Sequence, residues 1–455
     1  AIARGTRLIV VDPRDIGLSK TADLHIKLKP GTNVAFANGI VRQLIHDDLI
    51  DHAFIESRTE GFADLKAMVE AYTPERVAQI CAIDPRDLIA AARLYGRADR
   101  AAIVYCLGVT EHSSGTEGVM SLSNIAMVTG KYGRPGCGIN PLRGQNNVQG
   151  ACDTGYQKIA APGIVEKFEK AWGTHLPRFK GLYATDCFPK MIEGEVKGLF
   201  IFGEDPVRTD PDTHHVIKAL KNLEFLVVDE LFLTETAKYA DVVLPGRSYA
   251  EKEGTFSNTE RRVQRIRKAV EIPGTRADTD IFTDIMNRMG YPQPHLTPAQ
   301  IMDEIASVTP SFAGISHARL DGAENAGQGL QWPCTGPDHP GTPILHVGKF
   351  TRGLGRYSTA QYRDPSELPD SEYPLILTTG RVLYQYNACA MTDKTEGINE
   401  ISGRSFIELN TKDAERLGIS NGDRVKVTSR RGAIDSVAHV SDKTNVGESW
   451  MPFHF

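Results

Sequence analysis

One short segment, PLRGQNNVQGACD from Pro141 to Asp153, places a single arginine among amide side chains and glycines. Arg143 carries a planar fork of N–H donors that suits an anion with two oxygens. The glycines at 144 and 150 let the backbone come close to whatever the loop holds. These residue types predict a binding loop for a small carboxylate or a phosphate. A loop arginine more often neutralises a helix end or a buried acid, so the residues alone leave both interpretations open.

Composition narrows the class of ligand. The chain has 455 residues, 41% of them hydrophobic, which at ~150 residues per domain indicates about three domains. The net charge is -5, the isoelectric point is near 6.3 and no block of lysine or arginine occurs, which argues against a nucleic-acid or anionic-membrane partner. No apolar run approaches the roughly 20 residues of a membrane span. Small molecules are the expected ligands.

The cysteines and histidines show no metal-binding spacing. Seven cysteines are spread along the chain without a CxxC pair, which favours a reducing compartment and predicts a cytoplasmic protein. The thirteen histidines form no HExxH pattern. No metal ligand is therefore predicted within this chain.

The first third of the chain alternates strand and helix patterns. RLIVVDPR, from Arg7 to Arg14, predicts a strand, and a helix is expected over residues 33–46. Thr73-Pro74 and Asp84-Pro85 each place a capping side chain before a proline in the first helical position.

The alternation continues in the next segment. AAIVYCLGVT, residues 101–110, predicts a second buried strand. Ser114 and Glu117 have the spacing of a capping box for a helix that runs to about Thr129.

From Gly198 the runs GLFIFGEDP, EFLVVDELF and DVVLPG predict the strands of a second parallel sheet. Ligands of such sheets bind beyond the carboxyl ends of the strands. The residues at those ends are therefore candidate ligand contacts: Asp12, Arg14, Gly108, Glu111, Asp205, Glu230 and Gly246.

The last part of the chain is β-rich. A glycine- and proline-rich stretch, CTGPDHPGTP, indicates a linker after Pro333. A helix over residues 411–417 ended by Gly418, an Asn421-Gly422 turn and short alternating strands predict a compact barrel. The predicted fold is α/β, with two Rossmann-like parallel-sheet domains at residues 1–145 and 146–335 and a C-terminal β-barrel domain at 336–455.

Four segments together resemble a known family: GRPGCGINPLRGQNNVQGACD, FGEDPVRTD, ETAKYADVVLPGRSYAEKEGTFSNTERRVQR and LTTGRVLYQYNACAMT. They are similar to the catalytic subunit of molybdenum- or tungsten-dependent formate dehydrogenases, in the dimethyl sulfoxide reductase family. The resemblance implies two molybdopterin guanine dinucleotides, one per α/β domain, whose dithiolenes hold the metal. It also implies that Arg143 faces formate, which would be oxidised reversibly to carbon dioxide.

The resemblance assigns cofactor contacts residue by residue. On one dinucleotide side they are Asp12, Arg14, Gly31, Asn33 and Gln145. On the other side they are Asp205, Thr209, Glu230, Asp280 and Arg381. Gly108, Glu111 and Gly246 at strand ends, with Gln385 and Asn387 after the last arginine, complete the expected set. Taken singly, a strand-end acid is more often a helix cap, and the two amides after Arg381 would equally satisfy an exposed loop.

The sequence also departs from the family. Members normally begin with a four-cysteine iron-sulfur domain, followed by a cysteine or selenocysteine metal ligand and a histidine, and this sequence contains neither. We expect the cluster and that ligand only in a region upstream of Ala1. We also expect several more residues between Gly155 and Tyr156 and a longer tail after Phe455.

Partners follow from the resemblance. An iron-sulfur protein is expected to take the electrons, and a flavin subunit reducing NAD, a ferredoxin or a hydrogenase module is compatible with it. Two other functions stay open: another molybdopterin oxidoreductase such as a nitrate reductase, and a catalytically silent scaffold subunit of the same fold.

Overall fold

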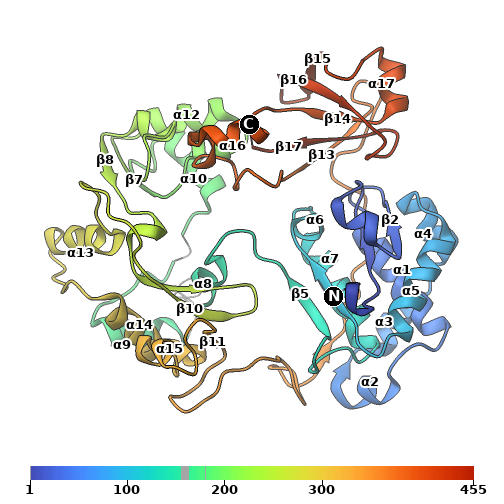
Figure 1. Cartoon of the computed structure of the whole chain (residues 1–455), viewed down its shortest axis with the longest axis horizontal. Coiled ribbons are helices and arrows are strands. Elements are labelled where there is room, and N and C mark those ends of the chain that lie inside the picture. The colour runs from blue at the N-terminus through green and yellow to red at the C-terminus, as the bar shows by residue number, and fades with distance from the viewer. Residues whose placement is uncertain (1, 155–162, 180, 455) are drawn as a thin grey trace. The chain divides into compact units, whose positions relative to one another are not determined.

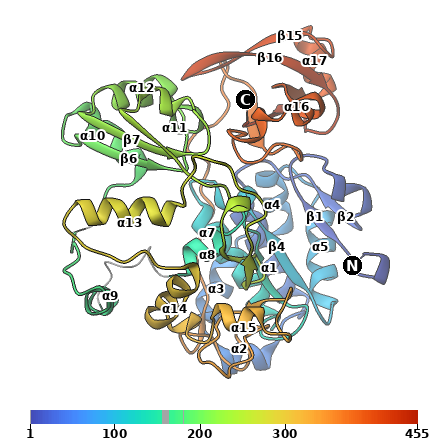
Figure 2. The same ribbon diagram turned by 60° about the vertical axis from the view of Figure 1, so that its left-hand side comes forward.

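A computed structural model describes residues 2–154, 163–179 and 181–454 (Figure 1, and a second view in Figure 2). The extra residues expected between Gly155 and Tyr156 fall outside the described part. The chain divides into two compact units. Unit 1 contains Ala1–Leu142, Ile344–Val382 and Arg404–Phe455, and unit 2 contains Arg143–Pro343 and Leu383–Gly403. None of the helices in the described residues has the length and apolarity needed to cross a membrane.

Unit 1 combines a helical layer with short strands. Its helices are α1 (Asn33–His46), α2 (His52–Arg58), α3 (Phe62–Val69), α4 (Pro74–Cys81), α5 (Pro85–Arg97), α6 (Leu107–Thr110), α7 (Gly115–Val128) and α17 (Thr411–Leu417). Its strands are β1 (Ile9–Val11), β2 (Leu24–Ile26), β3 (Thr59–Glu60), β4 (Ala102–Tyr105), β5 (Gly138–Pro141), β12 (Gly355–Arg356), β13 (Ile376–Gly380), β14 (Ile407–Leu409), β15 (Arg424–Ser429), β16 (Gly432–Val440) and β17 (Glu448–Pro452).

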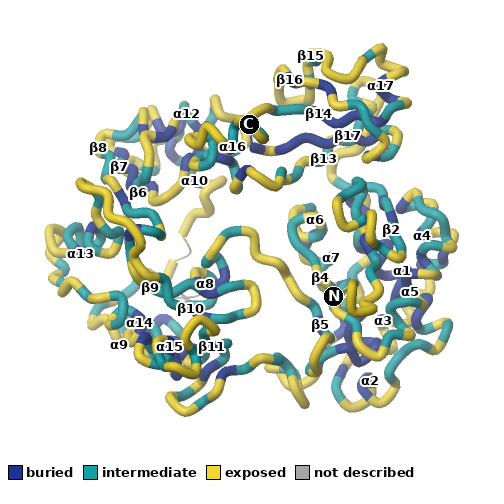
Figure 3. The backbone as a smooth tube through the Cα atoms, in the orientation of Figure 1, coloured by how far each residue is buried: buried dark blue, intermediate teal, exposed yellow. Residues whose placement is uncertain are grey.

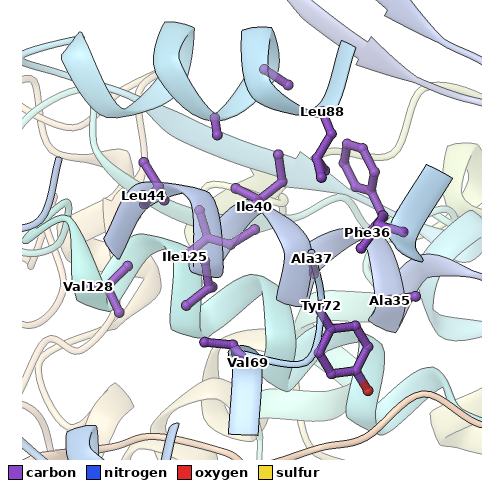
Figure 4. Packing of buried hydrophobic residues seen from close by; sticks show 14 of the residues in the cluster. Ala35, Phe36, Ala37, Ile40, Leu44, Val69, Tyr72, Leu88, Ile125 and Val128 are labelled. Atoms are coloured by element: carbon purple, nitrogen blue, oxygen red, sulfur yellow. The ribbon is translucent and has the colours of Figure 1, made fainter. Parts of the chain in front are cut away.

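The core of unit 1 forms around α1, which is mostly buried (Figure 3). Apolar residues recur along this helix at Ala37, Ile40, Val41 and Leu44, so that one continuous face meets its neighbours. Figure 4 shows side chains from α1, α5 and α7 meeting in this core. The helix has the bounds predicted from the sequence.

The proline-marked helix starts of unit 1 are confirmed. The Thr73 hydroxyl accepts a hydrogen bond from the Arg76 backbone N–H at 3.3 Å at the start of α4. The Asp84 carboxylate accepts one from the Arg86 backbone N–H at 2.8 Å at the start of α5. Each cap satisfies a backbone donor that has no partner inside the helix.

Two local predictions in unit 1 are wrong. Ser114 makes no capping hydrogen bond at the start of α7, and the carboxylate of Glu117 instead accepts a 2.7 Å bond from Arg363. The long-range ion pair has removed the acid that the capping box needed. The strand predicted over 101–110 is also shorter, because β4 ends at Tyr105 and α6 follows it.

The parallel pairing predicted for the first part of unit 1 is present as two pairs, β1 with β2 and β4 with β5. The C-terminal strands form one mixed five-stranded sheet in the order β13-β17-β14-β16-β15. Among the described residues β13 and β15 do not pair with each other, so closure into the predicted barrel is not confirmed. The helix ended by Gly418, with φ +66°, is confirmed as α17.

Unit 2 is built on the parallel sheet predicted from the sequence. Its strands are β6 (Gly198–Phe202), β7 (Phe225–Glu230), β8 (Val242–Pro245), β9 (Gly254–Ser257), β10 (Arg262–Ile266) and β11 (Leu330–Gln331). Its helices are α8 (Val148–Asp153), α9 (Val165–Trp172), α10 (Ala184–Ile192), α11 (Pro206–Thr209), α12 (Thr213–Lys221), α13 (Asp278–Arg288), α14 (Pro298–Val308), α15 (His317–Asp321) and α16 (Glu396–Ser402). β6, β7 and β8 pair in parallel, while β9, β10 and β11 form an antiparallel sheet.

Helices cover both faces of the parallel sheet in unit 2 (Figure 2). Ile201 of β6 packs in one cluster with residues of α10 and α12. Its neighbours Phe200 and Phe202 point the other way and meet Phe282 of α13, with ring centroids 5.6 and 5.2 Å apart. The alternation along a single strand therefore produces a three-layer arrangement.

The turn before α1 generates a stability prediction. Gly31 has φ +86°, and a Cβ there would come 2.5 Å from Cγ of Pro365. Gly31→Ala should lower the free energy of unfolding by about 2–4 kcal/mol, because it adds backbone strain and a clash. Gly17→Ala is the matched control, since a Cβ there meets no atom within 4 Å. Equal melting temperatures for the two variants in calorimetry would contradict this role of Gly31.

Candidate functional site

Arg143 lies in an exposed stretch that begins at the end of β5. Its Nε donates a 3.0 Å hydrogen bond to Oε1 of Gln149, which is 8% exposed on α8. Gln149 in turn donates through Nε2 to the carboxylate of Asp153. Among the described residues no acid lies within ion-pairing distance of Arg143, and its two Nη groups make no hydrogen bond. The guanidinium is thus oriented by a neutral amide while its charge and its fork of donors stay available.

The other amides of this loop hold the loop itself. Asn147 has a left-handed φ of 62°, and its Oδ1 accepts a 2.9 Å bond from the Ser257 backbone. Asn146 exchanges two hydrogen bonds with the Tyr386 hydroxyl, at 3.2 and 2.8 Å. A Cβ on Gly150 would lie 2.2 Å from Asn147 Oδ1, which explains the second glycine. Only the Gln145 side chain among the four amides has no hydrogen bond to the described residues.

The strand-end residues of unit 2 gather where the parallel sheet predicts them. Asp205, Glu230 and Gly246 follow or end β6, β7 and β8 at their carboxyl ends. Asp205 is buried, and its Oδ1 accepts bonds from the backbone and hydroxyl of Thr236 at 2.9 and 2.6 Å. This carboxylate therefore ties the loop after β7 to the loop after β6, and one of its oxygens is already used.

Two further predicted contacts of unit 2, Thr209 and Asp280, are less enclosed. Thr209 is exposed at the end of α11, with its hydroxyl 3.4 Å from Asp210 Oδ2. Asp280 lies in the first turn of α13, and its Oδ1 is 3.3 Å from Nδ1 of His295.

Negative charge accumulates at the strand ends of unit 2. Burial raises the pKa of Glu230, and the nearby carboxylates of Asp205 and Glu204 add to this effect. Burial raises the pKa of Glu204 too, with a further contribution from Asp210. Such an edge repels phosphate but accepts hydrogen bonds from N–H groups or hydroxyls, such as those of a guanine edge or a ribose.

Asp229 is a candidate that the sequence reasoning missed. It is 1% exposed, and neither of its carboxyl oxygens has a hydrogen-bond partner among the described residues. A Cβ on Gly246 would come 2.7 Å from its Oδ1 and 3.1 Å from Oδ1 of Asp278. Burial, with the carboxylate of Asp278, raises the pKa of Asp229 to about 6. A buried acid without a partner is costly unless a ligand provides donors. The signal in the sequence was an acid one residue before the end of a buried strand.

In unit 1, Asp12 and Arg14 follow β1. Oδ1 of Asp12 accepts a 2.9 Å bond from the Arg14 backbone, and burial raises the pKa of Asp12. The Nε of Arg14 donates to the buried carboxylate of Glu408, and its guanidinium lies 4.2 Å from the ring centroid of Trp450. Arg14 also lines a cavity of about 660 Å³. The anion contact at Arg14 stays a prediction.

A hydrogen bond joins two of the other predicted residues of unit 1, Asn33 and Gly108. The Gly108 carbonyl accepts bonds from Asn33 Nδ2 at 3.2 Å and from His112 Nε2 at 3.0 Å. Gly31 is buried against Pro365, and Glu111 is exposed at the end of α6. The Asn33 side chain therefore joins the start of α1 to α6, which follows β4.

The three predicted residues near the end of the chain differ in kind. Arg381, in unit 1, places its guanidinium 5.0 Å from the ring centroid of Phe453. Gln385, in unit 2, is buried, and its amide donates to the Ser402 carbonyl at 2.7 Å and accepts from Thr392 at 2.5 Å. This amide satisfies its own loop, which is the alternative weighed above. Asn387 adopts a left-handed φ of 49°.

Comparison with known proteins places these observations in a family. Residues 1–288 match the model of the molybdopterin oxidoreductase family, and residues 375–455 match the "Molydopterin dinucleotide binding domain". The chain is 48% identical to F420-dependent formate dehydrogenase 2 subunit alpha of Methanococcus maripaludis, covering 99% of this chain and 68% of that protein. It is 39% identical to formate dehydrogenase H of Escherichia coli, covering 99% and 65%.

A solved structure has the same fold. Acetylene hydratase from Pelobacter acetylenicus matches with a TM-score of 0.74 at 19% identity, covering 99% of this chain and 67% of that chain. At this level of identity the match concerns architecture alone.

The buried acid of β7 generates a pH prediction. Because the folded state holds the Asp229 proton more tightly than the unfolded state, stability should fall as pH rises from the ordinary value of 3.8 through about 6. Asp229→Asn removes this titration, so the variant should gain about 1–3 kcal/mol over the wild type across that range. Urea unfolding of the cofactor-free protein at several pH values measures the difference. A difference between the two proteins that does not change with pH would contradict the assignment.

Proposed function

The chain belongs to the molybdopterin oxidoreductase family, and from this premise we propose that it is the catalytic subunit of a formate dehydrogenase. Its reaction would be the reversible oxidation of formate to carbon dioxide. The observation that carries the proposal is the geometry of Arg143, whose Nε is fixed by Gln149 while both Nη groups remain unpaired in the described structure. Relatives named as formate dehydrogenases, at 39–48% identity, support it.

The polar groups of the two units fit a molybdopterin guanine dinucleotide in different ways. In unit 1, the guanidinium of Arg14 at a large cavity suits phosphate oxygens. In unit 2, the unpartnered carboxyl group of Asp229 and the acids around Glu230 suit N–H and hydroxyl donors. The contacts that we propose in unit 1 are Asp12, Arg14, Gly31, Asn33 and Arg381, and those in unit 2 are Gln145, Asp205, Thr209, Asp229, Glu230 and Asp280.

When bound, the molybdenum or tungsten dinucleotide pair supplies a two-electron acceptor. Arg143 would donate from its two Nη groups to the two oxygens of formate. A carboxylate held at both oxygens leaves only its C–H bond free to face the acceptor, so binding also sets orientation. Each turnover converts HCOO⁻ to CO2, one proton and two electrons. Gln149 keeps the arginine in place without cancelling its charge, because the amide is a neutral acceptor.

The electrons must leave the chain, and we propose an iron-sulfur protein as their first acceptor outside it. A flavin subunit that reduces NAD is compatible with this, as are a ferredoxin or a hydrogenase module. We also propose that the protein is cytoplasmic, that its domains span residues 1–145, 146–335 and 336–455, and that the C-terminal strands close into a barrel.

Substitution of the loop arginine tests substrate binding. Arg143→Lys keeps the positive charge but loses the two-pronged donor, so the KM for formate should rise by about ten- to a hundredfold, equivalent to ~1.5–3 kcal/mol. Steady-state kinetics with a dye acceptor would measure it, and molybdenum or tungsten content should stay at the wild-type level. Arg178→Lys is the control, since that exposed arginine pairs with Glu166 and Glu169 away from the loop. Unchanged formate kinetics in Arg143→Lys would contradict the role.

The activity itself is tested by metal and product analysis of the purified protein. Molybdenum or tungsten together with formate-dependent release of carbon dioxide would support the dehydrogenase. Metal with nitrate reduction instead of formate oxidation would indicate another reductase of the family, and absence of metal and pterin would indicate a silent scaffold.

A further inference from the structure

A buried carboxylate in unit 1 lies behind two cations of the cavity wall. Glu408, on β14, is 1% exposed, and its two oxygens have different partners. Oε2 accepts from Nε of Arg14, and Oε1 accepts from Nζ of Lys443 at 3.0 Å. Burial opposes ionisation, but the hydrogen bonds from Arg14 and Lys443 outweigh it and leave the pKa of Glu408 lowered. Neither Glu408 nor Lys443 belongs to the contacts predicted from the sequence.

This contact fixes the orientation of Arg14. The Nε edge is held by Glu408, and one face of the guanidinium lies over the ring of Trp450, 4.2 Å from its centroid. Cation–π stacking and a charge-assisted bond together restrict the plane of the group. Its two Nη groups make no hydrogen bond to the described residues, so they are the donors that remain for a ligand.

The cavity beside these groups has the charge that a diphosphate requires. Its volume is about 660 Å³, and its polar lining consists of Arg14, Lys20, Lys443, His25, Asp15 and Ser19. Asp15, the acid of this lining, is paired with His25 at 3.1 Å and with Lys27 at 2.8 Å. The cavity therefore presents more positive than negative charge.

Two adjacent cations repel each other unless a counter-charge holds them. A carboxylate that accepts one bond from each offsets this repulsion and holds the two cations on either side of it. Glu408 occupies that position and is withdrawn from solvent, so it need not itself meet the anion.

We infer that Glu408 is a positioning residue that presents Arg14 and Lys443 as paired donors to a diphosphate group in this cavity. Lys443 is thereby a further binding residue, supplied by the segment between β16 and β17. The inference rests on the proposed function where it identifies the diphosphate as that of a guanine dinucleotide, because a free nucleoside diphosphate offers the same chemistry.

The first experiment measures the dinucleotide carried by the purified protein. Acid hydrolysis releases guanine nucleotide, which chromatography quantifies per chain. Glu408→Gln keeps the side-chain volume but removes the charge, and we expect about a tenfold loss of retained nucleotide, as for one lost charge-assisted contact. Glu367→Gln is the matched control, because Glu367 also bridges two cations, Arg430 and Arg431, at 2.6 and 3.1 Å on an exposed surface. The control should keep the wild-type content.

A double substitution separates positioning from a structural effect. If Glu408 acts through Arg14, adding Glu408→Gln to Arg14→Gln should cause little further loss of nucleotide. Fully additive losses, or a lower melting temperature with unchanged nucleotide content, would overturn the inference. Lys443→Gln covers the case in which Glu408→Gln fails to fold, since the Lys443 side chain is 45% exposed. We expect Lys443→Gln to lose several-fold in retained nucleotide. An unchanged nucleotide content in this variant would show that Lys443 does not bind the diphosphate.

The second experiment uses inorganic pyrophosphate as the probe of cofactor-free protein. Trp450 stacks on Arg14, so its fluorescence should change on binding and Trp450→Phe should abolish the change. Weaker pyrophosphate binding in Glu408→Gln supports the inference, and unchanged binding overturns it. Glu408-dependent pyrophosphate binding by a protein that never carries guanine nucleotide would keep the anion site and contradict the proposed function instead.

Discussion

The common direction of β6, β7 and β8 is the constraint on which the chemistry of unit 2 depends. Parallel strands bring their carboxyl ends to one edge, where Glu204 and Asp205 follow β6 and where β7 ends in Asp229 and Glu230. Carboxylates close to one another and partly withdrawn from water hold their protons more tightly, as at Glu230 and Asp229. An edge of this kind costs stability in the empty protein and is satisfied by a ligand that donates hydrogen bonds.

Unit 1 solves the opposite problem. The groups that we propose to face a ligand there, Arg14 and Lys443, are cations, and the acid that holds them, Glu408, is buried. Unit 1 thus offers donors that suit phosphate oxygens, whereas unit 2 offers acceptors that suit the N–H and hydroxyl groups of a base or a sugar.

Arg143 shows a third arrangement. Its partner is an amide, and the acid of Asp153 is reached only through Gln149. An acid in direct contact would have orientated the guanidinium equally well, but it would also have neutralised the charge that a substrate anion needs. The sequence suggested that the amides beside Arg143 bind the ligand. In the structure Asn146 and Asn147 instead make hydrogen bonds that hold the loop in shape.

Local patterns in the sequence determined α1, the caps at Thr73 and Asp84, the parallel strands from Gly198 and the helix ended by Gly418, because each depends on residues a few positions apart. The sequence also located the loop around Arg143 and the acids at the strand ends, because residue type and position along the chain are enough to find them. Only the tertiary structure decided that Glu117 pairs with Arg363, that the Gln385 amide is consumed by its own loop, and that Asp229 and Glu408 are buried. Glu117 and Arg363 are 246 residues apart, and the burial of Asp229 and Glu408 depends on packed neighbours that exclude solvent, so neither outcome is encoded in local spacing. The partners of Gln385 are only 7 and 17 residues away, but the fold of that loop decides whether they meet the amide.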